Sequence, residues 1–234
     1  MNEPTEIKPP PVPVFDGSTR PGVMLEALLK APERVTDAIG KDRASVRTGW
    51  FFLIGALLFH AVFGAAMGLF GGAEAGLASA FKAPLVGLFA LVLCFPSLYV
   101  FSSVGGAPLS LRQTFLTATS CLAMIGLLLV GLAPVAWLFA VSTASLRFMM
   151  ILVLVAWGIA VWFARRYLNG IRLIPEFQQS GGISCWFLVF VVVSLQMATC
   201  LRPMLTAPTP ERGWLTSEKK FFMAHFSDCW ERGK

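Results

Sequence analysis

The side chain best placed to do chemistry is His60, because it is the ionisable group nearest the middle of a long apolar stretch. A buried imidazole can carry a proton or bind a ligand, or it can stay neutral and hydrogen-bond to a neighbouring helix. No Asp or Glu falls inside any long apolar stretch, and His225 lies in the polar C-terminal region. His60 therefore has no titratable partner and no second metal ligand, and we predict the neutral, structural role.

A row of polar side chains is the second candidate site. Thr114, Thr117 and Ser120 are spaced by three residues and lie on one side of a helix, next to Gln113. Gln196 lies in a later apolar stretch. These groups could line a path for a polar substrate, but in membrane helices they more often bond to another helix or to their own backbone. We predict that packing role and keep the path as the alternative.

Motifs for other chemistry are absent from the sequence. It contains no H-E-x-x-H, no G-x-S-x-G and no glycine-rich phosphate loop. Its five cysteines include no C-x-x-C pair, so zinc and thioredoxin-type chemistry have no support. We predict no catalytic residue, no metal and no cofactor.

The element that must position these groups is the uncharged segment Gln113 to Val141. Its 29 residues would form a helix of about 43 Å, against a hydrocarbon core of about 30 Å. The chain is 56% apolar and 14% charged, whereas soluble domains are about 25% charged. The sequence predicts an all-α, polytopic membrane helix bundle with five transmembrane helices. A re-entrant hairpin broken at Gly131 and Pro134 is the alternative for this segment.

The five predicted spans contain residues that fix their packing and shape. Gly64 and Gly68 are spaced by four and would allow a second helix to approach closely. Pro84 suits the first turn of the second span, whereas Pro96 and Pro134 lie in span interiors and predict kinks. The predicted spans are Gly49–Phe70, Lys82–Val104, Gln113–Val141, Arg147–Leu168 and Ile183–Arg202.

The two ends of the chain are polar. Residues 1–21 are rich in proline and predict a disordered leader, and residues 22–47 predict a cytoplasmic amphipathic segment of two helices divided at Pro32. That segment could lie in the headgroup plane or pack on the ends of the spans. Residues 48–203 form the membrane domain, and residues 204–234 a polar tail with a short amphipathic helix.

The net charge of +6 comes mostly from cations beside the apolar runs, which favours membrane topology over nucleic-acid binding. The cations flanking the first span predict a cytoplasmic N-terminus. Five spans would then put the C-terminus on the opposite side of the membrane. We predict membrane lipids, other membrane-protein subunits or copies of the chain as partners, and no nucleic acid.

Five phrases of the sequence carry a resemblance to known proteins: Lys82-Ala83-Pro84-Leu85, Phe95-Pro96-Ser97-Leu98-Tyr99-Val100, Leu109-Ser110-Leu111-Arg112-Gln113, Gln196-Met197 and Leu201-Arg202-Pro203. They resemble a group of uncharacterised bacterial multi-span membrane proteins, over residues 22 to about 226, which implies a bacterial inner membrane and a periplasmic C-terminus. The layout of a cytoplasmic lead-in followed by five clustered spans also resembles the Yip family of membrane-trafficking proteins. Yip-type proteins act as adaptors, so the resemblance implies a non-enzymatic adaptor, scaffold or accessory subunit. The alternative is a subunit of an oligomeric channel or transporter that uses the second and third spans.

Overall fold

A computed structural model describes residues 21–106, 108–171 and 181–200. Helices account for 91% of these residues, and no strand occurs among them. The predicted leader and polar tail fall mainly on residues 1–20 and 201–234, outside the described part. In chain order the helices are α1 (Pro21–Lys30), α2 (Pro32–Gly40), α3 (Val46–Gly68), the short 3-10 helix η1 (Leu69–Gly71), α4 (Ala73–Val104), α5 (Leu111–Ser142), α6 (Leu146–Ile171) and α7 (Gly181–Cys200).

Five of these helices, α3 to α7, are long and apolar enough to cross a membrane. The predicted all-α membrane bundle is therefore confirmed. The segment proposed as a re-entrant hairpin is instead one helix, because α5 continues through Gly131 and Pro134 to Ser142. Proline is tolerated inside membrane helices because neighbouring groups satisfy the carbonyl that it leaves free.

The second span differs from its predicted bounds. Helix α4 begins at Ala73, nine residues before Lys82, so Pro84 lies in the helix interior and not in its first turn. The connection between α3 and α4 is short, and Gly72 in it has a positive φ of 93°. Ala75 and Ser79 are fully buried against α3, and this packing outweighs the weak helix propensity of the nearby glycine.

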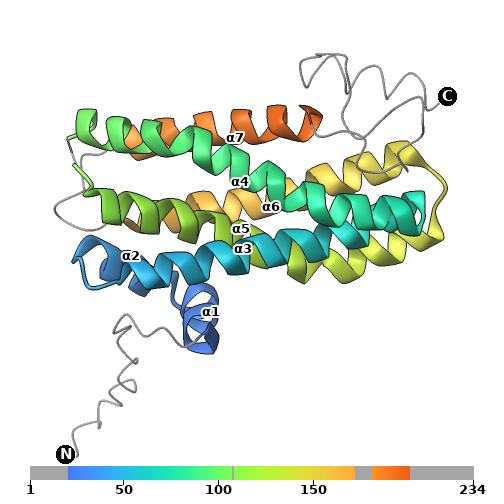
Figure 1. The fold of residues 1–234 in the computed structure, drawn as a ribbon, viewed down its shortest axis with the longest axis horizontal. Coiled ribbons are helices and arrows are strands. Elements are labelled where there is room, and N and C mark those ends of the chain that lie inside the picture. The colour runs from blue at the N-terminus through green and yellow to red at the C-terminus, as the bar shows by residue number, and fades with distance from the viewer. Residues whose placement is uncertain (1–20, 107, 172–180, 201–234) are drawn as a thin grey trace, which may run out of the picture.

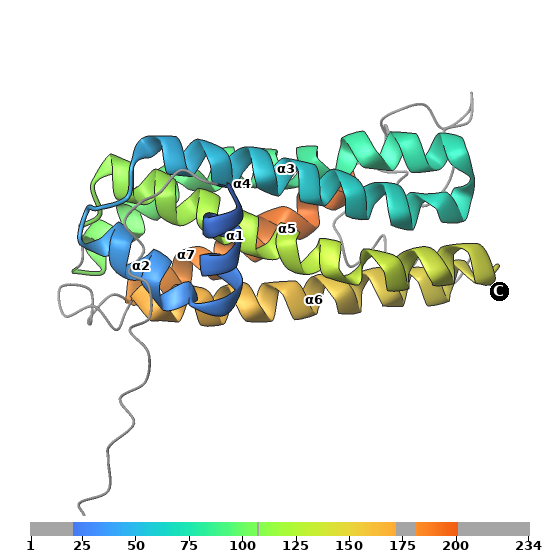
Figure 2. The same ribbon diagram turned by 90° about the horizontal axis from the view of Figure 1, so that it is seen from below.

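Helix α4 connects two parts of the bundle (Figures 1 and 2). Its first half packs on α3, where Gly64 meets Ser79 and Ala83. Its second half packs along α7, where the indole Nε1 of Trp186 donates to the Cys94 carbonyl at 2.8 Å. Helix α5 lies against α3 and α6, and its first half is almost wholly buried.

The N-terminal helices take two different positions. Helix α2 packs against α5 and α6, and Val35, Thr36, Ala38 and Ile39 are buried there. Helix α1 crosses the long axis of the bundle on its outside (Figures 1 and 2). The sequence left two positions open for this segment: in the headgroup plane, or packed on the ends of the spans. Helix α2 packs on the ends of the spans. Helix α1 lies across the long axis of the bundle, which is the orientation of a helix in the headgroup plane.

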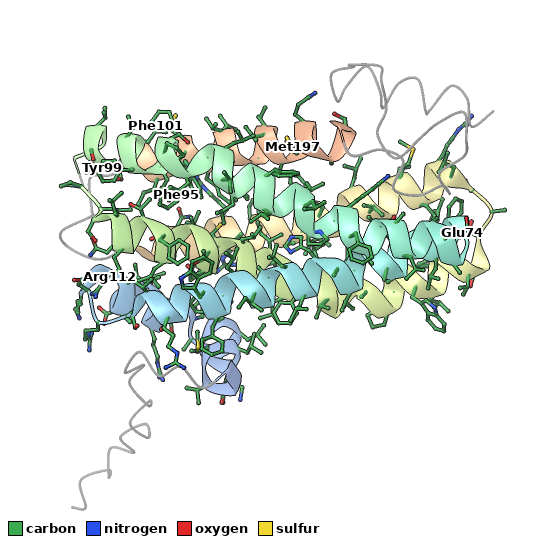
Figure 3. The ribbon with its side chains drawn as sticks, in the orientation of Figure 1. Glu74, Phe95, Tyr99, Phe101, Arg112 and Met197 are labelled. Carbon is green, nitrogen blue, oxygen red and sulfur yellow. The ribbon has the colours of Figure 1, made fainter. Side chains whose placement is uncertain are left out.

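The two ends of the bundle differ in charge. Arg112 lies at one end and Glu74 at the other (Figure 3), where the first turn of α6 also places Arg147. We call the first the basic end: it comprises residues 30–47, Arg112 and the last turns of α6, with Arg165 and Arg166. Eight cations lie there among the described residues, against the three acids Glu33, Asp37 and Asp42.

Candidate functional site

His60 lies in the interior of the bundle, at the junction of α3, α4 and α5. Its Nδ1 is 2.7 Å from the Ala56 carbonyl, one turn earlier in α3. A carbonyl only accepts, so Nδ1 carries a proton, and in a neutral ring Nε2 is then an acceptor. The partner belongs to the same helix, whereas the sequence reading expected a bond to a neighbouring helix.

Two glycines make the space for this ring. A Cβ added at Gly126 of α5 would lie 2.8 Å from His60 Nδ1, and one added at Gly87 of α4 would lie 3.7 Å from Nε2. The imidazole therefore fills a slot between the backbones of two other helices. The sequence reading missed both glycines. The sequence did contain a signal for them, because a glycine in the interior of an apolar helix usually marks the close approach of another element.

Gly64 and Gly68 lie on the face of α3 that packs against α4. A Cβ at Gly64 would overlap the Ser79 carbonyl oxygen, and one at Gly68 would lie 2.7 Å from the Ala75 oxygen. Small residues also recur every four positions on the facing helix, at Ala75, Ser79, Ala83 and Gly87. The sequence reading missed this second row because it began the span at Lys82. The two rows let the backbones of α3 and α4 come into contact.

The hydroxyl row of α5 is buried and bonds mainly to its own helix. Thr114 donates to the Ser110 carbonyl at 2.9 Å, and Ser120 donates to the Thr117 carbonyl at 3.1 Å. The phenol of Tyr167 in α6 donates to the Ser120 hydroxyl at 2.7 Å. The Thr117 hydroxyl has no hydrogen-bond partner within the described structure. This arrangement ties α6 to α5.

Gln113 joins the start of α5 to the end of α2. Its side-chain oxygen accepts from the Ser110 backbone N–H at 2.9 Å, which completes a capping box. Its Nε2 donates to the carbonyls of Ile39 and Gly40, at 3.3 and 3.0 Å. These carbonyls belong to the last turn of α2, where the helix supplies no further donors, and the Ile39 carbonyl also accepts from the Asp42 backbone N–H at 3.1 Å. Gln113 therefore caps two helices at once.

Arg112 holds the loop that follows α2. Its Nε donates to a carboxylate oxygen of Asp42 at 2.9 Å, and its Nη2 donates to the Asp42 backbone carbonyl. Asp42 has a left-handed backbone with φ of 55°, which is uncommon for a residue other than glycine. Together, Arg112 and Gln113 fix residues 39–42 against the bundle. We call this contact the α2 clasp.

The remaining predicted residues are not brought to His60. Gln196 lies on α7, which packs along α4, so it does not join the hydroxyl row of α5. Pro96 and Pro134 lie inside α4 and α5, and both helices continue through them. The kinks at these two prolines stay a prediction.

Lys82 is a buried cation that the sequence reading placed at the start of a span. Since α4 begins at Ala73, Lys82 lies about 13 Å inside the helix, with 3% of its surface exposed. Charged side chains inside spans are rare and often functional. The apolar residues before it, Leu77 and Phe81, were the signal that the helix starts earlier.

No arrangement of these residues forms a metal site in the described part of the chain, where no group of three His, Cys, Asp or Glu side chains comes together. Comparisons with protein-family models, with curated proteins and with solved structures gave no match. The resemblances noted in the sequence stay predictions. What the fold defines is the class: a five-helix membrane bundle with two docked N-terminal helices.

Proposed function

We propose that this protein is a non-enzymatic membrane adaptor or accessory subunit, which presents a fixed surface at its basic end to other membrane-protein subunits. The observation that supports the proposal is the α2 clasp. A nine-residue helix is not stable alone in water, and α2 and the loop after it are held by Gln113 and Arg112, from 73 and 70 residues away. A plain tether would need no such contacts.

The surface held in this way is charged and exposed. Lys41 and Arg43 both pair with Asp37, at 2.7 and 2.5 Å, and Glu33 lies exposed earlier in α2. Charged rims of this kind favour selective association more than tight binding. The excess of cations favours a cytoplasmic position for this end in a bacterial inner membrane.

The alternative, a channel or transporter subunit, has less support. The hydroxyls of Thr114 and Ser120 donate to carbonyls of their own helix, and Tyr167 covers Ser120. A polar path through α5 would need these groups to face a water-filled space.

Site-specific photo-crosslinking in native membranes tests the adaptor role. A photoreactive residue at Lys41 should give a discrete adduct with another protein, and the same residue at Glu74, at the opposite end, should not. Gln113→Leu should remove the Lys41 adduct by loosening the α2 clasp. Equal adducts from both positions would contradict the proposal. Ion or solute flux through vesicles containing the purified protein would favour the alternative.

A further inference from the structure

A groove lies on the surface of the bundle between α5 and α6. Its volume is about 380 Å³, within the range of about 300–1,000 Å³ typical of small-molecule sites. Five residues of the segment 127–132 line it, together with Ile159 of α6 and Leu29 of α1. Every lining residue is apolar, and all but Leu29 belong to membrane-spanning helices. The lipid around this part of the bundle therefore presents hydrocarbon chains to the groove.

Gly131 keeps the groove open. It is exposed, and a Cβ added to it would meet nothing within 4 Å. Leu29 and Ile159 are also exposed, at 55% and 42%. The groove thus opens outwards, and a larger side chain at position 131 would fill it without moving a neighbouring backbone.

The outer face of α6 changes character from the groove towards the basic end. Ile159, Phe163 and Arg166 are exposed and lie on one side of the helix, at steps of four and three residues. Trp162 is 66% exposed beside them. Apolar, aromatic and cationic residues follow one another over about 10 Å. This is the order of acyl chain, interface and phosphate in a phospholipid leaflet.

Helix α1 supplies the second wall at the same level. Met24 and Leu28 are buried against the bundle, whereas Leu29 reaches the groove. The next residue, Lys30, is exposed and pairs with Glu26 at 3.0 Å. These charges require water or headgroups close to this side of the groove.

We propose that this groove binds one acyl chain of an anionic phospholipid whose phosphate lies at Arg166. The apolar lining and the open space at Gly131 select the chain. The exposed guanidinium of Arg166 selects an anionic headgroup. The inference rests on the membrane bundle alone and is independent of the adaptor role.

Native mass spectrometry of the delipidated protein in detergent tests the site. The protein is titrated with phosphatidylglycerol and, separately, with phosphatidylcholine carrying the same acyl chains. The first phosphatidylglycerol should bind about fivefold more tightly for each cation that it contacts. Gly131→Phe should weaken this first binding by about tenfold or more, because the ring occupies the space of the chain.

Gly158→Phe is the matched control. Gly158 is also an exposed glycine of a membrane-spanning helix with nothing within 4 Å of an added Cβ, and it does not line the groove. The Gly158→Phe variant should bind the first phosphatidylglycerol as tightly as the wild type does. Arg166→Gln should remove the preference for phosphatidylglycerol and leave phosphatidylcholine binding as it was, whereas Arg47→Gln, at an exposed cation on α3, should change neither.

Three results would overturn the proposal: unchanged first binding in folded Gly131→Phe, equal weakening by Gly158→Phe, or a preference for phosphatidylglycerol that survives Arg166→Gln. A dimer of the wild type that Gly131→Phe dissociates would assign the groove to a second copy of the chain instead. If Gly131→Phe does not fold, the Arg166→Gln comparison still decides.

Discussion

At the scale of single residues, the position of His60 depends on glycines that belong to other helices. The ring lies between Gly87 and Gly126, and its own proton goes to the Ala56 carbonyl. A Cβ at Gly126 would compete with the imidazole for the same space, whereas one at Gly87 would make ordinary van der Waals contact with Nε2. The hydrogen bond between His60 and Ala56 and the spacing between the helices at this junction therefore depend on each other.

Gly126→Ala should destabilise the protein. The new methyl would lie 2.8 Å from His60 Nδ1 and 3.1 Å from the Ala56 oxygen, so the ring or the helix must shift. Overpacking of this kind costs about 1–3 kcal/mol. The measurement is thermal unfolding of the detergent-solubilised protein.

Gly131→Ala is the control in the same helix. Nothing lies within 4 Å of its added Cβ, so the change should be neutral or stabilising by up to about 1 kcal/mol. If both variants unfold at the wild-type temperature, the close packing around His60 contributes no stability.

At the scale of helices, α3 and α4 form a pair through facing rows of small residues. Gly64 and Gly68 meet the backbone of α4 at Ser79 and Ala75. Little hydrophobic force acts between helices in lipid, so close backbone contact supplies the attraction. A branched side chain on either row would separate the two helices.

Replacing both Gly64 and Gly68 with Ile should therefore reduce the yield and the unfolding temperature of the solubilised protein. The added atoms would overlap the carbonyls of Ser79 and Ala75, which cannot move without displacing α4. Gly55→Ile is the comparison, since an added Cβ there meets only the Phe59 ring at 3.7 Å. Wild-type stability of the double variant would contradict the role of this interface.

The α2 clasp acts between elements that are far apart in the sequence. Gln113→Leu removes the two side-chain hydrogen bonds to the carbonyls of Ile39 and Gly40 and the side-chain half of the capping box of α5. A buried polar group left without its partner costs about 1–3 kcal/mol. We expect faster hydrogen exchange at the amides of α2, measured by mass spectrometry, while exchange in α3 and α4 stays slow. Unchanged protection of α2 would show that its apolar packing suffices.

At the scale of the whole molecule, the two ends differ in charge, and this difference predicts how the bundle lies in the membrane. Eight cations lie at the basic end among the described residues, whereas Glu74 is in the first turn of α4 at the opposite end. Cations in short segments next to spans stay on the cytoplasmic side. We therefore expect the basic end to be cytoplasmic.

Thiol labelling tests this orientation. In a variant with its native cysteines replaced by serine or alanine, a cysteine at Glu74 should react with a membrane-impermeant reagent in intact cells. A cysteine at Ser45, which is exposed at the basic end, should react only after lysis. The opposite pattern would invert the topology. The native Cys229, which lies outside the described residues, should behave like the cysteine at position 74 if the tail is periplasmic.

The sequence by itself determined the number and the nature of the spans. Long uncharged stretches are required by the thickness of the hydrocarbon core, and the need to satisfy every backbone group makes them helices. These are local constraints, which is why α5 and α6 begin and end within a few residues of their predicted bounds. The start of α4 was misplaced because Lys82 resembles a flanking cation.

Only the tertiary structure decided what the polar residues do. In a membrane protein both the lipid-facing and the inward faces are apolar, so hydrophobic periodicity does not reveal which side of a helix is buried. The slot around His60 needs Gly87 and Gly126 at matching heights on two other helices. The two roles of Gln113 likewise depend on where α2 folds back. Such contacts follow from the rotation and height of whole helices, which no local stretch of sequence specifies.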